Sequence, residues 1–216
     1  MDAQRIYARR FDPDLKFRKE MWKILCRDFF QKYIDPGSRV LEIGAGYCEF
    51  INHIQAAEKT ALDLNPDVSA HAAPGVRVIL ERSSRMGAVS DQSVDVVFAS
   101  NFFEHLSREE ILATFREVNR VLVPGGKFMV LQPNIRFCSR DYWMFFDHLT
   151  PIDDRAFVEA LEICGFELQE VIARFLPFTT KSRLSGSPFL VRLYLRLRMV
   201  WSLFGQQSFI LSRKPK

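Results

Sequence analysis

The sequence predicts an α/β fold in which a mostly parallel sheet is covered by helices on both faces. Short apolar runs typical of strands alternate along the chain with stretches whose apolar residues recur every three or four positions. The first apolar run leads directly into a glycine-containing turn, GAG at 44–46. With 216 residues, 48% of them hydrophobic and 26% charged, the chain can bury one large core, so we expect a single domain.

Seven strands and the helices between them can be placed from this pattern. A first helix is predicted over 14–33, where apolar residues from Leu15 to Tyr33 share one face, and Pro36-Gly37 ends it. A second helix is predicted over about 47–56, directly after the glycine turn. The strands are predicted at 39–44, 59–64, 76–80, 93–100, 127–132, 166–173 and 207–212.

Capping residues predict where two later helices begin and end. Ser107 and Glu110 have the spacing of a capping box, and Pro124-Gly125-Gly126 ends the helix that this box opens. Thr150-Pro151 predicts the start of another helix, with the hydroxyl as N-cap and the proline in the first turn. Gly165 predicts its end.

Composition narrows the class of protein. The four cysteines form no CxxC pair and have no ligand spacing with histidine, so neither a disulfide framework nor a structural zinc site is indicated. The first residues are charged and lack an apolar signal core, and no stretch approaches the roughly 20 apolar residues that a membrane-spanning helix needs. We therefore expect a cytoplasmic protein.

The charges are segregated along the chain. Residues 1–40 carry 10 basic and 6 acidic groups, residues 41–170 carry 11 and 20, and residues 171–216 carry 9 basic groups and no acidic one. A purely basic tail indicates attraction to an anionic partner, such as phosphate groups, a membrane surface or nucleic acid. A solvated face is the alternative that charge alone leaves open.

Part of this tail is a long, basic and hydrophobic insert at about 174–205. Ser187-Pro188 and Gly205 predict the bounds of one helix, on which Arg192 and Arg196 share a face. Such a helix could cover a site, pack on a partner or lie peripherally on a membrane with its arginines at the headgroups. A core helix with solvated arginines is the alternative.

The glycine turn predicts a nucleotide-like ligand at the end of the first strand. Glycine allows the tight turn and the close approach of the backbone to a ligand, and the free amides of the turn then face that ligand. A dinucleotide and S-adenosylmethionine are the two candidates. The third glycine of a G-x-G-x-x-G pattern would fall at Glu49, a poor neighbour for a pyrophosphate, which disfavours the dinucleotide. Asp63 ends the second strand, where a carboxylate can accept both ribose hydroxyls of an adenosine.

Four motifs in order resemble the class I S-adenosylmethionine-dependent methyltransferases, in particular their small type 11 group. They are VLEIGAGYCEF, ALDLNPD, SVDVVFASNFFEHL and VLVPGGKFMVLQP, and together they cover about residues 38–133. The resemblance implies a Rossmann-like, doubly wound sheet of seven strands with an antiparallel C-terminal strand. It also implies a helical cap at 1–37, a cofactor-binding core at 38–133 and an acceptor-side half at 134–216.

Carried over by position, the resemblance implies the residues that bind S-adenosylmethionine. Glu42, Gly44 and Gly46 would border its methionine half, Asp63 would hold the ribose, and Leu64 would lie against the adenine. This sequence departs from the family pattern at two places. Cys48 stands where the pattern has its third glycine, and the chain reads ERSSRM where the family often carries an acidic residue near the adenine amine. The remaining contacts, in chain order, would come from Ser83 or Ser84 at the adenine and from Ser100, Asn101 and Phe102 at the sulfonium.

Two histidines are candidates for the catalytic base. Methyl transfer is an in-line displacement at an activated sulfonium, so no metal is required, but a hydroxyl acceptor needs a base. His105 follows the fourth strand and His148 follows the fifth, beyond the carboxyl ends of strands where ligands bind in parallel sheets. A structural role is the alternative for each. His53 and His71 are expected at the surface.

The predicted function is methyl transfer from S-adenosylmethionine, which becomes S-adenosylhomocysteine, to a hydroxyl of a glycan precursor. The FFDHLTP segment and the basic insert resemble members that accompany bacterial polysaccharide assembly, and a lipid-linked or nucleotide-linked sugar would suit the insert. Methylation of RNA or another small molecule is the alternative. SNFFEH lacks the motif of base-methylating enzymes, so nucleic acid is disfavoured. A non-catalytic, cofactor-binding partner protein is a further alternative.

Overall fold

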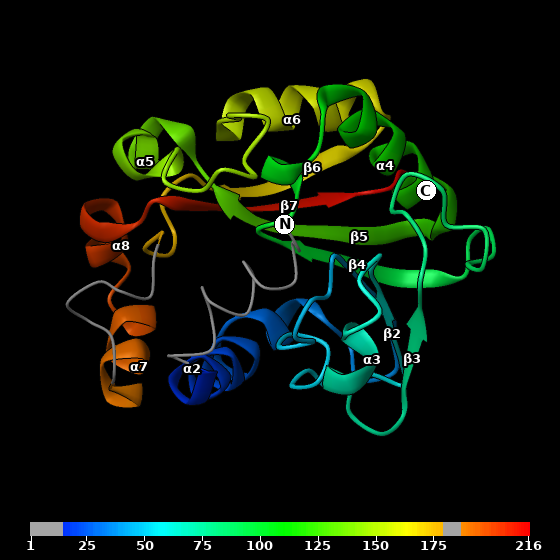
Figure 1. Cartoon of the computed structure of the whole chain (residues 1–216), viewed down its shortest axis with the longest axis horizontal. Coiled ribbons are helices and arrows are strands. Elements are labelled where there is room, and N and C mark those ends of the chain that lie inside the picture. The colour runs from blue at the N-terminus through cyan, green and yellow to red at the C-terminus, as the bar shows by residue number, and fades with distance from the viewer. Residues whose placement is uncertain (1–14, 179–186) are drawn as a thin grey trace.

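The computed structural model describes residues 15–178 and 187–216 and contains the predicted sheet (Figure 1). The strand order is β3-β2-β1-β4-β5-β7-β6. Strands β1 to β5 are parallel to one another, whereas β7 is antiparallel to both β5 and β6. The doubly wound architecture with antiparallel C-terminal pairing is therefore confirmed. The strands are β1 (Arg39–Ile43), β2 (Glu58–Leu62), β3 (Val76–Ile79), β4 (Val94–Ser100), β5 (Leu122–Pro133), β6 (Glu167–Ile172) and β7 (Gln207–Arg213).

Helices cover both faces of the sheet (Figure 1). The side chains of α2, α7 and α8 join one buried cluster, and those of α4 and α6 join another. Alternate residues of each central strand supply the two clusters, since Val96 and Phe98 belong to the first and Val97 and Ala99 to the second. The helices are α2 (Leu15–Asp28), α3 (Val68–His71), α4 (Arg108–Val121), α5 (Ile135–Tyr142), α6 (Asp154–Ile163), α7 (Pro188–Arg196) and α8 (Arg198–Phe204), with the 3-10 turns η2 (Phe30–Tyr33) and η3 (Phe103–His105).

The helix predicted over about 47–56 is wrong, because this segment forms a series of turns. Cys48 has a left-handed backbone with φ of 55°, which interrupts a right-handed helix. The amide of Ile51 donates to the side chain of Glu42 at 3.0 Å instead of a helical carbonyl. A buried carboxylate thus takes the hydrogen bond that a helix would need.

Side-chain hydrogen bonds at the helix N-termini decide where α4 and α6 begin. Ser107 and Glu110 form the predicted capping box, with both reciprocal hydrogen bonds present. The predicted start at Thr150 is wrong, because α6 begins after Asp153, whose carboxylate accepts from the amides of Arg155 and Ala156. The hydroxyl of Thr150 donates instead to the Leu106 carbonyl, at 2.5 Å.

The insert contains two helices where one was predicted. Leu197, with φ of −95° and ψ of 74°, separates α7 from α8. Pro188 and Gly205 do bound the pair, and a Cβ at Gly205 would lie 2.5 Å from the carbonyl carbon of Arg174. Residue 14 of the first predicted helix and the basic residues Lys181 and Arg183 of the insert lie outside the described residues.

Candidate functional site

The predicted cofactor residues gather at the carboxyl ends of three neighbouring strands. β1 lies between β2 and β4, and all three are parallel, so their carboxyl ends reach the same edge of the sheet. Gly44 follows β1, Asp63 follows β2, and Asn101 follows β4. This edge is where open α/β sheets bind their ligands.

The glycine turn depends on a close packing contact. Gly44 has a left-handed backbone with φ of 65°, and its amide donates to the Leu62 carbonyl at 2.9 Å. A Cβ at Gly44 would lie 2.3 Å from Cδ2 of Phe102. Glycine is therefore needed here both for the backbone conformation and for the ring of Phe102 that lies against it.

Asp63 connects the glycine turn to the end of β2. Its two carboxylate oxygens accept from the amides of Gly46 and Asn65, each at 2.8 Å. An ionised carboxylate offers about four lone-pair sites, so these two bonds leave acceptor capacity for ribose hydroxyls. Asp63 thus orders the turn and can also bind a ligand.

A second carboxylate lies near Asp63, at the end of β1. Glu42 is only 4% exposed, and burial raises the pKa of its carboxyl well above its usual range, against the Ile51 amide, which lowers it. The negative charges of Glu49 and Asp63 raise this pKa further. The carboxylate of Asp63 would attract a positively charged ligand, whereas it would repel a pyrophosphate. S-adenosylmethionine, a sulfonium with an α-ammonium group, fits this charge.

The end of β4 turns sharply toward η3. Asn101 has a left-handed backbone with φ of 47°, and its amide donates to the Leu131 carbonyl at 2.8 Å. Its side-chain amide donates to Ser100 Oγ at 3.2 Å. Phe102 follows and packs against Gly44. Of the three residues predicted on the sulfonium side, Phe102 therefore contacts the glycine turn.

The residues predicted to contact the adenine differ in how exposed their side chains are. Leu64 is 57% exposed beside Asp63, so its side chain is available to a ligand. Ser83 is buried, and its hydroxyl is hydrogen-bonded to Thr114 Oγ1 of α4 at 2.8 Å. Ser84 is half-buried. Of the two serines, Ser84 keeps the more accessible side chain.

The two predicted catalytic histidines come together beside a carboxylate. The rings of His105 and His148 are 5.1 Å apart between centroids. Glu104 joins them, and potential ligand atoms of the three side chains lie within 4.8 Å of one another. Glu104 is 2% exposed, and burial raises the pKa of its carboxyl to about 7, although the neighbouring His105 lowers it. We call these three residues the Glu–His–His cluster.

Hydrogen bonds hold this cluster together across more than 40 positions of sequence. The amides of Leu149 and Thr150 donate to the Glu104 carbonyl, at 2.8 and 3.2 Å. His105 Nδ1 lies 3.1 Å from the Asp147 carbonyl oxygen and 3.4 Å from Asp147 Oδ2. His148 is 7% exposed and packs against the rings of Tyr142, Phe145 and Phe178.

Sequence reasoning missed Glu104. It is adjacent to His105 in FFEHL, and the available signal was an acidic residue beside a histidine at the end of a strand. The other two histidines lie elsewhere: the ring of His53 bonds the Glu49 carbonyl, and that of His71 packs on Tyr47.

Comparison with known proteins agrees with this geometry. Residues 41–130 match a protein family described as "Methyltransferase domain". The chain is 28% identical over 131 residues to the ribosomal protein L11 methyltransferase of Symbiobacterium thermophilum, a match that covers 56% of this chain. The matched region spans 41% of the length of that curated relative.

Solved structures share the fold. A S-adenosylmethionine-dependent methyltransferase from Archaeoglobus fulgidus is 19% identical, with a TM-score of 0.69, and the superposition covers 99% of this chain and 100% of that one. The [4+2]-cyclase SpnF is 18% identical, with a TM-score of 0.64, covering 91% of this chain and 80% of that one. The fold alone therefore does not identify a reaction.

The family match and the glycine turn agree on the same segment of the chain. That segment contains Glu42, Gly44, Gly46 and Asp63, four of the residues for which the sequence predicts a cofactor contact. Residues 41–130 therefore resemble a methyltransferase domain, in a chain whose fold is similar to that of S-adenosylmethionine-dependent methyltransferases.

Proposed function

We propose that this chain transfers the methyl group of S-adenosylmethionine to a hydroxyl group, and that the acceptor is a sugar or glycan precursor linked to a lipid or nucleotide. The observation that carries the hydroxyl assignment is the Glu–His–His cluster at the end of β4. It begins two residues after Phe102, whose ring lies against the glycine turn. A proton-accepting group thus closely follows, along the chain, the residue that packs on the glycine turn.

In this proposal the cofactor residues act as the resemblance implies. Glu42, Gly44 and Gly46 border the methionine half, with Ser100, Asn101 and Phe102 on the sulfonium side, while Asp63 binds the ribose and Leu64 and Ser84 border the adenine. Their position at one edge of the sheet supports this assignment. When bound, S-adenosylmethionine supplies an activated methyl group.

The residues on the acceptor side then remove one proton, that of the acceptor hydroxyl. The hydroxyl oxygen forms a bond to the methyl carbon, the carbon–sulfur bond breaks with its electron pair going to sulfur, and the hydroxyl proton goes to His148. Burial of His148 among aromatic rings keeps bulk water away from this step. His105, held by Asp147, positions the cluster.

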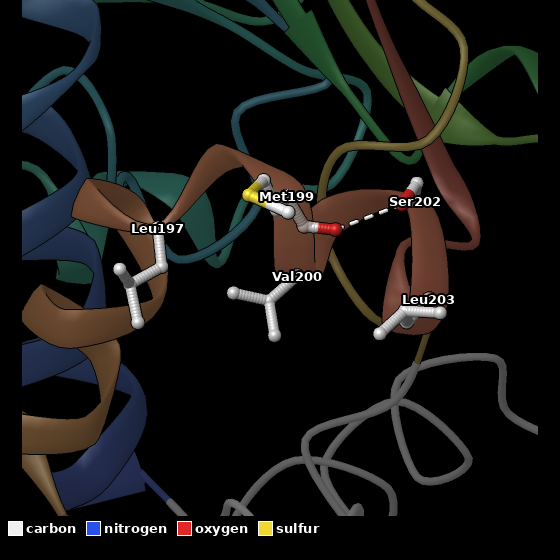
Figure 2. Close-up of a pocket in the computed structure, with 5 residues that line it drawn as sticks. All are labelled: Leu197, Met199, Val200, Ser202 and Leu203. Atoms are coloured by element: carbon white, nitrogen blue, oxygen red, sulfur yellow. Dashed lines mark hydrogen bonds between the residues drawn. The ribbon is translucent and has the colours of Figure 1, made fainter.

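An apolar, basic surface on α7 and α8 supports the idea of a lipid-linked or membrane-borne acceptor. Leu197, Val200 and Leu203 project to one side (Figure 2), and Leu197 and Leu203 are 50% and 69% exposed. Arg192, Arg196 and Arg198 are exposed on the same two helices. Among the described residues, no helix has the length and apolarity needed to cross a bilayer.

The proposed reaction is tested by formation of S-adenosylhomocysteine with a panel of acceptors. Nucleotide sugars and lipid-linked sugars should support turnover, whereas RNA and ribosomal protein should not. Turnover on RNA or protein alone would overturn the choice of acceptor. Cofactor binding without turnover on any acceptor would favour the non-catalytic partner role.

Replacing Asp63 by alanine should weaken binding of S-adenosylhomocysteine by about 1.5–3 kcal/mol, or roughly 10- to 150-fold in Kd. The substitution removes the proposed ribose acceptor and releases the amides of Gly46 and Asn65. Titration calorimetry measures the change. Asp67→Ala is the matched control, because Asp67 is an exposed carboxylate nearby that makes no capping hydrogen bond. Equal affinities for wild type and Asp63→Ala would refute the ribose assignment.

Replacing Arg192, Arg196 and Arg198 by glutamine should weaken binding to anionic vesicles by about 1 kcal/mol per charge. Added salt should have the same effect, because exposed charges are screened within about 8–10 Å. Vesicle co-sedimentation measures it, with binding of S-adenosylhomocysteine expected to stay unchanged.

The matched control removes three positive charges from the other face of the sheet. Arg108, Arg116 and Arg155 are exposed on α4 and α6, and their replacement by glutamine should leave vesicle binding nearly unchanged. If both triple variants lose binding equally, net charge and not the α7–α8 surface is responsible. If wild type does not bind vesicles at low salt, the membrane part of the proposal fails.

A further inference from the structure

We propose that Glu104, His105 and His148 form a binding site for one divalent transition-metal ion, with Zn²⁺ as the ion that their ligand chemistry fits best. The site lies on the acceptor side of the cofactor turn. This inference departs from our expectation that the reaction needs no metal.

The side chains already converge. One carboxylate and two imidazoles offer ligand atoms that lie within 4.8 Å of one another. Ligand atoms around tetrahedral zinc are about 3.3–3.5 Å apart, given metal–ligand distances of about 2.0–2.1 Å. Closing the widest of these separations by about 1.3–1.5 Å, within the reach of side-chain torsions, would bring the three groups onto a shared ion.

The Glu104 carboxylate is an independent sign of a missing partner. Glu104 is 2% exposed, and within the described ranges 15–178 and 187–216 its Oε2 has no hydrogen-bond partner. Buried polar atoms are hydrogen-bonded in nearly all native structures, so such an atom calls for a ligand or an ion. The nearest candidates for sharing that ion are the two imidazoles of the cluster.

His105 has the outer contact that metal-binding histidines have. Its Nδ1 is hydrogen-bonded to the Asp147 carbonyl at 3.1 Å and lies 3.4 Å from Asp147 Oδ2. An Nδ1–H that donates there leaves Nε2 with the lone pair that binds a metal. Such second contacts orient the ring and raise its basicity as a ligand.

The backbone around the site is fixed by the fold. The amides of Leu149 and Thr150 bind the Glu104 carbonyl, and Thr150 Oγ1 binds the Leu106 carbonyl. The hydroxyl of Tyr142 donates to the Thr150 carbonyl at 2.6 Å. Because these bonds join residues 104–106 to 149–150, the two backbone segments that carry the three ligands are held together before an ion arrives.

The ligand set selects the class of ion. Two imidazoles and one carboxylate suit Zn²⁺ and other first-row transition ions, whereas Mg²⁺ prefers an all-oxygen shell. Three protein ligands also leave a fourth position for water or a substrate oxygen, as in catalytic zinc sites.

The role of the ion rests on the proposed function, although its binding does not. An acceptor hydroxyl at the fourth position would have a lowered pKa and would lose its proton to water, and the oxygen would then attack the methyl carbon. In the metal-bound form His148 would be a ligand and not the base, and the ion would acidify the hydroxyl enough for water to take its proton.

The test measures binding of Zn²⁺ alone to full-length protein that has been treated with a chelator. Competition with a chromophoric zinc indicator should give one ion per chain. Glu104→Gln and His105→Ala should each weaken the affinity at least tenfold, and Mg²⁺ in excess should not compete. His53→Ala is the matched control, because it removes a histidine outside the cluster and should leave the affinity unchanged.

Several results would overturn the inference. Wild type could bind no Zn²⁺, or both cluster variants could bind it as wild type does, or His53→Ala could weaken binding equally. Binding of S-adenosylhomocysteine shows that each variant is folded, which keeps a negative result interpretable. Turnover by chelator-treated wild type at the full rate would leave the proposed function standing while excluding a metal role in it.

Discussion

Replacing Gly44 by valine should destabilise the protein by about 2–5 kcal/mol and abolish detectable binding of S-adenosylhomocysteine. The left-handed backbone at this position, with φ of 65°, costs a branched residue about 1–2 kcal/mol. The contact with Phe102, 2.3 Å from a Cβ, adds an overpacking cost of about 1–3 kcal/mol. Total stability of a domain is only about 5–15 kcal/mol, so the shift should be plain in urea unfolding. Calorimetry measures the loss of ligand binding.

Gly75 provides the matched control for Gly44. It is also left-handed, with φ of 88°, but a Cβ there would meet no atom within 4 Å. Gly75→Val should therefore show the backbone cost alone and bind the ligand normally. The double variant Gly44→Ala/Phe102→Ala should recover part of the stability that Gly44→Ala loses. A Gly44→Val protein with wild-type stability and affinity would show that the glycine turn is not where we place it.

Replacing His148 by phenylalanine should lower the methyl-transfer rate by about 10²- to 10⁴-fold while leaving the affinity for S-adenosylhomocysteine nearly unchanged. Phenylalanine keeps a ring against Tyr142, Phe145 and Phe178 and removes both nitrogens. His148→Ala should show a similar loss of rate together with lower stability, because it also leaves a cavity. Rates come from formation of S-adenosylhomocysteine at saturating cofactor.

The comparison variant for His148 is His105→Ala. A greater loss of rate in His105→Ala would identify His105 as the base. An equal loss of rate, together with loss of Zn²⁺ binding, is expected if both histidines share an ion. His53→Ala should leave the rate unchanged. Parallel loss of rate and cofactor affinity in His148→Phe would indicate a structural role instead.

Local rules predicted much of the fold because the residues that decide it are close in sequence. The capping box needs only Ser107 and Glu110, three residues apart, and the strands follow from short segments rich in apolar residues. Asp63 was placed beside the glycine turn because parallel strands carry their carboxyl ends to one edge. The structure has this contact, in the hydrogen bond from the Gly46 amide.

The predictions that are wrong or incomplete concern residues whose contacts are distant in the sequence. Ile51 leaves the helical pattern because Glu42, nine positions earlier, takes its amide. Thr150 does not cap α6 because its side chain binds the Leu106 carbonyl across 44 positions. Glu104 is part of the site only because the 147–150 segment folds back onto η3 and places His148 beside it. No periodicity in the sequence carries such information.

The position of β7 has a consequence for synthesis on the ribosome. β7 is the last strand in the chain, yet it lies between β5 and β6 and pairs with both. Because the chain emerges from its N-terminus, β5 and β6 are both translated before the strand that joins them exists. Until then β5 presents an unpaired edge, which is the kind of surface on which nascent chains associate with one another. The sheet is therefore completed only when β7, made after both of its neighbours, enters between β5 and β6.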